Sequence, residues 1–409
     1  MSESEVPISS VATITMGLSP KGETYNTIGE GGPLLNGPTE FGDFYPNCTL
    51  FTTDSKRECK KGDLIFCVRG STTGRMNWAD KRYSLGRGVC SIAGKTEMDT
   101  RFIKYCLDVK LDALLKNAGG GTFPNLRKDD IEGFQIPFPI YRQKIATILS
   151  AYDDLIENNN RRIKILEEMA QAIYKEWLVN FRFPGHEKIK MVKSELGMIP
   201  EGWAVKEMQE VADVIDCLHS KKPKEIENGN KFLLQLFNIS EGGKLDLSKK
   251  YYIADEDYEL WTRRIEASEG DCVVTNVGRI AAVAQIPQGI KAALGRNMTA
   301  VRANKKFITP PFLIQYLLSP HMESEVLKKT DRGTIMDSLN VKNIVKLSIN
   351  IPTSEIMENF DNAVKPIRRR IELLVNQNMI LRRTRDLLLP KLISGEVDVE
   401  KMDIQGMGA

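Results

Sequence analysis

Two stretches of the chain carry apolar residues at the spacing of long amphipathic helices. Between residues 141 and 181, a seven-residue interval connects Ile145, Tyr152, Asn159, Leu166 and Ile173. Between residues 356 and 393, the same interval connects Phe360, Ile367, Leu374, Leu381 and Leu388. Positions seven apart lie on one face of a helix, so each stretch predicts a helix of roughly 40 residues with one apolar face.

Neither helix can leave its apolar face in water, which predicts that the two pack on each other as an antiparallel coiled coil. Asn159 and Asn378 occupy core-type positions, where a polar residue fixes the register of a coiled coil at some loss of stability. Pro366 is expected either to start the second helix or to kink it. The alternative, that each helix only covers its own domain, is disfavoured because both greatly exceed the usual three or four turns.

The remaining segments have the short apolar runs and Gly-rich turns of mixed α/β globular domains. Runs at 64–68 and 88–92 predict buried strands, residues 101–117 predict a helix, and the glycine-rich stretch 29–37 predicts a loop. We therefore predict an α+β fold. Its parts are a first globular domain at 1–140, a central helical spacer at 141–185, a linker and second globular domain at 186–355, and a C-terminal helical spacer at 356–409.

The two globular segments repeat the same short motifs about 200 residues apart, a period far above the 20 to 50 residues of solenoid repeats. The repeated motifs are Gly62-Asp63 and Gly270-Asp271, Leu85-Gly86-Arg87 and Leu294-Gly295-Arg296, and Gly121-Thr122 and Gly333-Thr334. This repetition indicates two copies of one domain plus a helix. Such a chain presents two similar surfaces to a partner.

Composition narrows the class of protein. The 409 residues are 42% hydrophobic and 27% charged, which is typical of a folded chain. Seven cysteines without a Cys-x-x-Cys pair predict reduced thiols, and three histidines without ligand spacing predict no metal site. An acidic start and the lack of a long apolar run predict neither a signal peptide nor a membrane span, and hence a cytoplasmic location.

No catalytic residue is expected. The chain lacks a phosphate-binding loop, a Gly-x-Ser-x-Gly elbow and a His-Glu-x-x-His motif. The triplet Glu58-Cys59-Lys60 has the acidic-x-Lys form that nucleases use, but no positioned second carboxylate accompanies it. The pair Asp153-Asp154 is predicted to lie on a solvated face of the first long helix.

Cationic and hydrogen-bonding residues gather near the repeated strands. Arg and Lys reach guanine edges and phosphates, Asn and Gln reach adenine, and Ser and Thr contact either, so this set suits duplex DNA. With a net charge of only +3, any basic surface must be local. The predicted DNA-contacting residues are Arg69, Ser71, Thr72, Thr73, Arg75, Asn77, Lys81, Arg82, Arg87 and Thr122 in the first copy, and Asn276, Arg279, Lys291, Arg296, Asn297 and Thr334 in the second.

Over essentially its whole length the chain resembles the specificity subunits of type I restriction-modification enzymes. The resemblance rests on the repeated motifs and on segments 17–22, 136–139 and 349–352. It also rests on the helical tails 166–177 and 382–396. It implies two target-recognition domains, each reading one half of an asymmetric bipartite DNA sequence, held by the antiparallel helices about an approximate two-fold axis.

The resemblance further implies partners that perform the chemistry. These are two modification subunits, which are adenine methyltransferases that use S-adenosylmethionine, and restriction subunits that hydrolyse ATP with magnesium and cleave DNA. No cofactor is expected in this chain, which lacks the Asn/Asp-Pro-Pro-Tyr/Phe motif of an amino-methyltransferase.

Two other functions remain open at this level. A stand-alone nuclease or methyltransferase would bind S-adenosylmethionine or cut DNA by itself. A scaffold protein that joins other proteins would show no salt-dependent affinity for DNA. For a reader of two half-sites, the length and register of the helices are expected to set the unread spacer between them.

Overall fold

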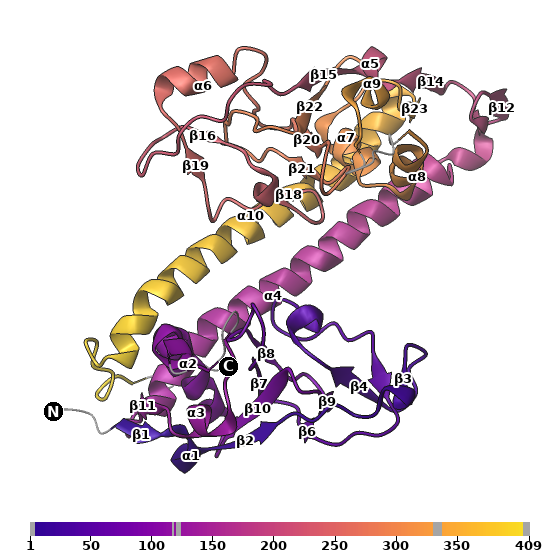
Figure 1. Cartoon of the computed structure of the whole chain (residues 1–409). Coiled ribbons are helices and arrows are strands. Elements are labelled where there is room, and N and C mark those ends of the chain that lie inside the picture. Colours follow the sequence, from indigo (N-terminus) through magenta and orange to yellow (C-terminus); the bar gives the residue numbers. More distant parts are fainter. Residues whose placement is uncertain (1–4, 117, 120–123, 330–337, 404–409) are drawn as a thin grey trace. The chain divides into compact units, whose positions relative to one another are not determined.

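The computed structural model describes residues 5–116, 118–119, 124–329 and 338–403. The chain folds into two compact units, the first formed by residues 1–158 and 380–409 and the second by residues 159–379. Figure 1 labels their elements, a mixture of helices and strands that confirms the α+β class. No helix within the described ranges is long and apolar enough to cross a membrane. All seven cysteines are free thiols, as predicted.

Both predicted long helices are present. They are α4 (Arg142–Tyr174), which continues into one π-helical turn (Lys175–Val179), and α10 (Ser354–Ile393). Each contributes one part to each unit. Helix α10 begins 12 residues before Pro366. The proline therefore lies inside the helix and does not start it, which was one of its two predicted roles.

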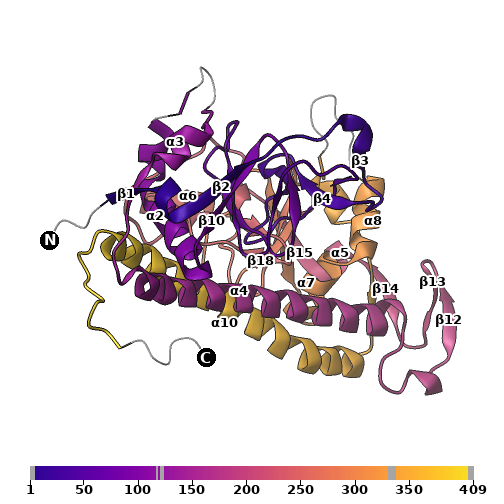
Figure 2. The ribbon, with the colours of Figure 1, turned by 90° about the horizontal axis from the view of Figure 1, so that it is seen from below.

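Within each unit, α4 and α10 run antiparallel, and Figure 2 shows the two helices side by side. In the second unit Ile163 of α4 packs against Ile371 and Leu374 of α10. In the first unit Asp153 of α4 forms an ion pair with Arg385 of α10. Residue numbers rise along one helix as they fall along the other, so the predicted antiparallel packing is confirmed.

The two asparagines at core-type positions meet in this seam. Asn159 Nδ2 donates to Asn378 Oδ1 at 2.9 Å, and Asn378 Nδ2 donates to Asn160 Oδ1 at 2.8 Å. Asn159 and Asn378 are only 4% and 5% exposed. Any shift in register would bury these amides without partners, which costs about 1 to 3 kcal/mol for each polar group. The pair therefore specifies one register.

The helices also cover the globular cores. In the first unit Ile145 and Leu149 of α4 join Leu392 of α10 in the main apolar cluster. In the second unit Tyr174 of α4 lies against Phe360 of α10, with ring centroids 6.2 Å apart. The helices therefore both pack on each other and cover the cores of the globular domains, although the sequence had presented these two arrangements as alternatives.

The first unit contains two main sheets. A four-stranded sheet has the order β2 (Ala12–Met16), β10 (Val89–Gly94), β7 (Leu64–Cys67), β8 (Met76–Trp78). A five-stranded sheet has the order β3 (Tyr25–Asn26), β5 (Phe51–Thr52), β4 (Gly32–Leu35), β9 (Tyr83–Leu85), β6 (Glu58–Cys59). The other elements are β1 (Glu5–Pro7) paired with β11 (Gln135–Pro137), and the helices α1 (Ile8–Val11), α2 (Glu97–Lys116) and α3 (Lys128–Glu132).

The second unit repeats the four-stranded sheet in the order β15 (Ala212–Asp216), β22 (Met298–Ala303), β20 (Cys272–Thr275), β21 (Val283–Gln285). Its two-stranded sheets are β14 (Ala204–Glu207) with β23 (Ser348–Ile351), β16 (Phe232–Leu233) with β19 (Tyr251–Tyr252), β17 (Ile239–Ser240) with β18 (Lys244–Leu245), and β12 (Met191–Ser194) with β13 (Gly197–Pro200). Its short helices are α5 (Met208–Val211), α6 (Asp255–Trp261), α7 (Pro310–Leu317), α8 (Pro320–Lys329) and α9 (Val341–Ile344).

Strands β7 and β10 and helix α2 confirm the predicted elements of the first domain. The prediction of a loop at 29–37 is wrong in part, because β4 lies inside that stretch. Leu34 and Leu35 of β4 are fully buried and pair in parallel with β9. Two apolar residues among glycines and prolines are too short a run to predict a strand, and only the partner strand, distant in sequence, makes it one.

Candidate nucleic-acid interface

The repeated Gly-Asp motifs build the same turn in both units. Gly62 and Gly270 have φ angles of +90° and +88°, a conformation that favours glycine. The Asp63 carboxylate accepts the Lys60 N–H at 2.9 Å, and the Asp271 carboxylate accepts the Ser268 N–H at 2.8 Å. Each turn leads into a buried central strand, β7 or β20, so these motifs serve the scaffold.

The Leu-Gly-Arg motifs pass close to a neighbouring segment of backbone. A Cβ atom on Gly86 would collide with Asn36, and a Cβ atom on Gly295 would collide with the Leu234 carbonyl. Glycine is therefore required at both positions. Arg87 follows Gly86 and is exposed to solvent.

Backbone hydrogen bonds align the two units residue by residue. Val68 N–H donates to Gly88 O at 2.9 Å, and Asn276 N–H donates to Asn297 O at 2.8 Å. Leu126 N–H donates to Val68 O at 3.0 Å, as Leu339 N–H donates to Asn276 O at 2.9 Å. Val68 and Asn276 are thus equivalent, and the residue equivalent to Arg69 is Val277.

An open cleft in the first unit collects side chains suited to nucleic acid. It is lined by Ser19, Pro20, Gly22, Tyr25, Asn36, Arg69, Arg87 and Gly88. Arg69 and Arg87 are exposed, and neither guanidinium has a hydrogen bond or ion pair within the described part of the chain. Two arginines that lack partners among the described residues and lie beside hydroxyl and amide groups can bind phosphates or base edges.

Most other predicted contacts of the first unit already have protein partners. Thr73 Oγ1 donates to Gly70 O, Arg75 donates to the carbonyls of Pro38 and Phe41, and Arg82 forms an ion pair with Glu58. Lys81 lies over the Tyr83 ring with Nζ 5.6 Å from its centroid. Ser71 is exposed and Thr72 is half-buried, both on the loop between β7 and β8.

Two asparagines predicted to contact DNA, one in strand β8 and one directly after strand β20, are buried. Asn77 is 4% exposed and its Nδ2 donates to Gly42 O at 3.0 Å. Asn276 is 9% exposed and its Nδ2 donates to Thr299 Oγ1 and to Leu339 O, at 3.0 and 2.9 Å. These amides hold loops to the sheet, and their burial argues against contact with a base.

In the second unit, the predicted residues also separate into paired and unpaired groups. Arg279 donates to Ile239 O at 2.8 Å, and Lys291 forms an ion pair with Glu266 at 2.8 Å. Arg296 and Asn297 are exposed, and Asn297 has a φ of +64°. Arg296 has no partner among the residues that the structure describes. Thr122 and Thr334, also predicted as contacts, lie outside the described residues.

Sequence reasoning missed Ser19, Tyr25 and Asn36 as lining of the cleft. Ser19 belongs to a segment that was informative only as a family motif, although its Oγ accepts the Arg87 N–H at 3.2 Å. Asn36 follows the unexpected strand β4. Asn36 becomes visible only once the parallel pairing of β4 with β9 brings it beside Arg87, and Ser19 only once Leu18 N–H binds the Leu85 carbonyl.

The acidic-x-Lys triplet has a structural explanation. Glu58 pairs with Arg82, and Cys59 is completely buried in β6. Burial raises the pKa of the Cys59 thiol to about 12, so the thiol stays protonated at neutral pH. The triplet therefore offers no open carboxylate pair for a metal-dependent nuclease.

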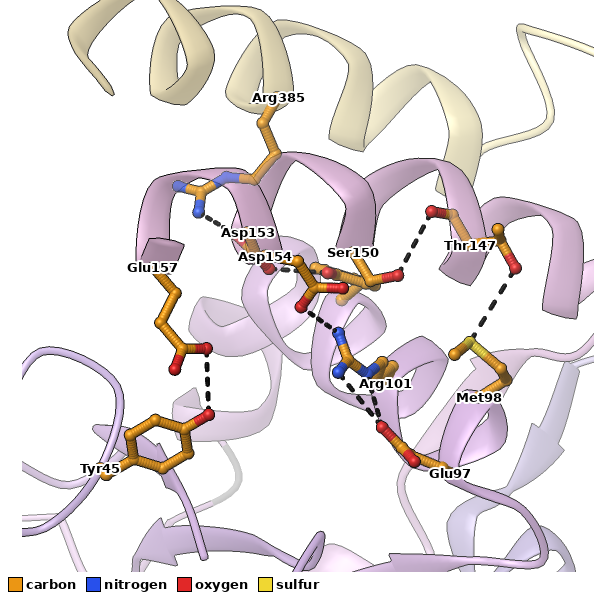
Figure 3. Close-up of polar contacts among 11 residues, drawn as sticks. Tyr45, Glu97, Met98, Arg101, Thr147, Ser150, Asp153, Asp154, Glu157 and Arg385 are labelled. Carbon is orange, nitrogen blue, oxygen red and sulfur yellow. Dashed lines mark hydrogen bonds and ion pairs between the residues drawn. The ribbon is translucent and has the colours of Figure 1, made fainter. Parts of the chain in front are cut away.

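The prediction that Asp153 and Asp154 share a solvated face is wrong for Asp153 (Figure 3). Asp153 is 6% exposed, pairs with Arg385 and accepts a hydrogen bond from Tyr105 Oη at 2.6 Å. Burial, together with the neighbouring Asp153 carboxylate, raises the pKa of Tyr105, so this hydroxyl remains a donor. Asp154 is largely exposed and pairs with Arg101 at 2.9 Å.

One group of potential metal ligands occurs in the described residues. Atoms of Asp216, Cys217 and His219 lie within 4.8 Å of one another. His219 Nε2 is 2.8 Å from Asp216 Oδ2, which an ordinary hydrogen bond explains. The Cys217 thiol is buried, and burial raises its pKa. The expected absence of a metal site in this chain stays a prediction.

Comparison with known proteins gives the family. A family described as the type I restriction modification DNA specificity domain matches residues 5–168 and again 200–375. The chain therefore belongs to this family and contains two copies of its domain. The match covers both sheets that carry the repeated motifs.

Curated relatives and a solved structure agree with this assignment. The type I restriction enzyme MjaIX specificity subunit of Methanocaldococcus jannaschii is 27% identical over 368 residues, covering 86% of this chain and 82% of the relative. The EcoBI specificity subunit of Escherichia coli is 23% identical, with 97% and 86% covered. A crystal structure of a type I S subunit from M. genitalium has the same fold, with a TM-score of 0.59 at 17% identity and 95% of each chain covered.

Proposed function

We propose that this chain is the DNA-reading subunit of a type I restriction-modification complex, in which each unit reads one half of an asymmetric bipartite sequence. The observation that carries the proposal is that the two scaffolds are equivalent and place an arginine at the same position, Arg87 in one unit and Arg296 in the other. Both arginines are exposed and unpaired within the described residues. Similar scaffolds with different side chains suit two related but unequal half-sites.

Catalysis would belong to partner subunits. We propose that two modification subunits supply adenine methylation with S-adenosylmethionine, and that restriction subunits supply ATP hydrolysis and magnesium-dependent cleavage in the cytoplasm. Helix α10 offers a surface for protein partners: Ile380 and Leu387, seven residues apart in the first unit, are 66% and 60% exposed. A partner helix or loop that covered both side chains would remove their apolar surface from water.

Mapping of methylated adenines in genomic DNA, with and without the gene for this chain, tests the proposal. The expected result is a bipartite methylated sequence that disappears when the chain is removed. The purified complex should also lose affinity for that sequence steeply as salt rises, because released counterions drive binding to phosphates. Binding of S-adenosylmethionine or DNA cleavage by the chain alone would instead support an enzyme, and the absence of a salt-dependent affinity for DNA would support a protein scaffold.

Changing the length of the long helix should alter the spacing of the DNA site. Insertion or deletion of about four residues, roughly one helical turn, between Ile145 and Trp177 is expected to change the unread spacer and leave both half-sequences intact. The Asn159–Asn378 pair argues that register is fixed in the native seam. A methylation map with altered half-sequences and an unchanged spacer would contradict this prediction.

A further inference from the structure

The two units place a side-chain amide at the same position beside their equivalent arginines. In the first unit, Gly86 N–H donates to Leu35 O at 2.8 Å, and the next residue is Asn36. In the second unit, Gly295 packs against the Leu234 carbonyl, and the next residue is Gln235. The side chain of Asn36 lies against Gly86, and that of Gln235 lies against Gly295.

Strand pairing confirms this equivalence independently. Leu35 pairs in parallel with Leu85, two residues before Arg87. Leu233 forms a parallel bridge with Ala293, three residues before Arg296. The pair Leu34–Ser84 in the first unit also lies three residues before its arginine, so it is equivalent to the bridge Leu233–Ala293. Asn36 follows Leu34 by two residues, just as Gln235 follows Leu233. The same backbone geometry therefore presents an amide and a guanidinium together in both units.

The chemistry of this pair matches base edges. Arginine donates two hydrogen bonds to O6 and N7 of guanine, and the amide of asparagine or glutamine pairs with N6 and N7 of adenine. Asn36 and Gln235 are half-buried, and Gln235 Nε2 donates to the Leu234 carbonyl at 3.0 Å, so the protein restrains both side chains without burying them completely. A restrained amide loses little conformational freedom on binding, which suits readout better than a mobile surface side chain.

The two units differ at one further position. Arg69 lines the cleft of the first unit, and its equivalent in the second unit is Val277. Valine has no hydrogen-bonding group, whereas arginine can bind a guanine or a phosphate. At this position the first unit therefore offers a polar contact that the second unit lacks.

We propose that Asn36 with Arg87, and Gln235 with Arg296, are equivalent base-reading pairs for the two half-sites, with Arg69 adding a contact in the first half-site only. This inference rests on the proposed function, because it names the residues by which each unit would read duplex DNA. The pairs are specificity-determining positions on a shared scaffold.

Methylation-site mapping of the intact complex with single variants tests the inference. Arg87→Ala and Asn36→Ala should each relax one base position of one half-site, and Arg296→Ala and Gln235→Ala one position of the other. Loss of a bidentate contact worth about 1 to 3 kcal/mol corresponds to about a 5- to 150-fold loss of discrimination at that position. Asn36→Gln, which copies the second unit with little change in shape, should shift preference in the first half-site only.

Matched controls use exposed cations outside the cleft. Lys56→Ala in the first unit and Arg263→Ala in the second should leave both half-sites unchanged. Absence of any bipartite site in the wild-type complex would refute the proposed function itself. A wild-type site that persists base for base in the Arg87 and Asn36 variants, with folding verified by thermal unfolding, would overturn the inference alone. A uniform loss of affinity across all sequences with a shallower salt dependence would also overturn it, because it would make Arg87 a phosphate contact.

Discussion

Replacing Asp153 by alanine should lower the free energy of unfolding of the first unit by about 3 to 5 kcal/mol, the usual cost of removing one partner from a buried ion pair. The variant would leave Arg385, whose side chain is 21% exposed, without its buried counter-charge. Burial by itself would lower the pKa of Arg385, but the carboxylates of Asp153 and Asp386 outweigh it and raise that pKa. Tyr105 Oη would also lose its acceptor.

Hydrogen exchange of peptides from residues 142–158 and 380–393, combined with thermal unfolding, measures this loss in the first unit. Asp154→Ala is the matched control, since Asp154 is 57% exposed and its ion pair with Arg101 is expected to contribute at most about 1 kcal/mol. The double variant Asp153→Ala, Arg385→Ala should lose less stability than the sum of the losses in the two single variants. Equal destabilisation by Asp153→Ala and Asp154→Ala would show that burial is not the deciding factor.

The long helices could be predicted because their pattern is local in the sequence. Five positions spaced seven residues apart leave little choice of structure, and two helices with such apolar faces are expected to pack on each other. Asn159 and Asn378 were recognisable as polar residues in an apolar seam. That they bond to each other follows from the register, which the sequence pattern alone left open.

Asp153 shows where a local pattern fails. Neighbouring acidic residues on an amphipathic helix usually face water, and Asp154 does. The burial of Asp153 depends on Arg385 and Tyr105, which lie 232 and 48 positions away in the sequence. A charge can be buried only when such partners are present, and local spacing carries no record of them.

The candidate interface was predictable as an inventory of residues but not as an arrangement. Arg69, Arg87 and Arg296 look like Arg75, Arg82 and Arg279 in the sequence. The structure separates them, because the second group bonds to carbonyls or to Glu58 and the first group has no such partner among the described residues. Asn36 escaped notice because its role depends on the pairing of β4 with β9.

In the second unit, Arg368→Ala should destabilise the fold by about 2 to 4 kcal/mol, because it removes both buried packing and buried hydrogen bonds. Arg368 of α10 is 6% exposed and donates to the carbonyls of Gly242 and Gly243, at 3.3 and 3.1 Å. These glycines form the turn between β17 and β18, with φ angles of +69° and +73°. A Cβ atom on Gly242 would collide with Glu167 of α4, so the turn, α4 and α10 are fitted closely together.

The local effect of Arg368→Ala should be largest in this turn. Gly243 O also accepts the Gln285 N–H at 3.1 Å, but no second donor to Gly242 O accompanies Arg368 in the described residues. Hydrogen exchange in residues 239–245 should therefore accelerate more than exchange in α6, which lies elsewhere in the same unit. Arg368→Met, which keeps most of the buried volume, should lose less stability than the alanine variant.

Arg369→Ala provides the control for the Arg368 variants, because the side chain of Arg369 is 49% exposed and pairs at the surface with Glu372. Surface substitutions of this kind usually change stability by no more than about 0.5 kcal/mol. Burial lowers the pKa of Arg368, which means that burying the charged guanidinium costs free energy. The contacts with the two carbonyls and the nearby carboxylates offset part of that cost. If Arg368→Met proved more stable than the wild type while the turn kept its exchange rates, packing would explain this position and the hydrogen bonds would not.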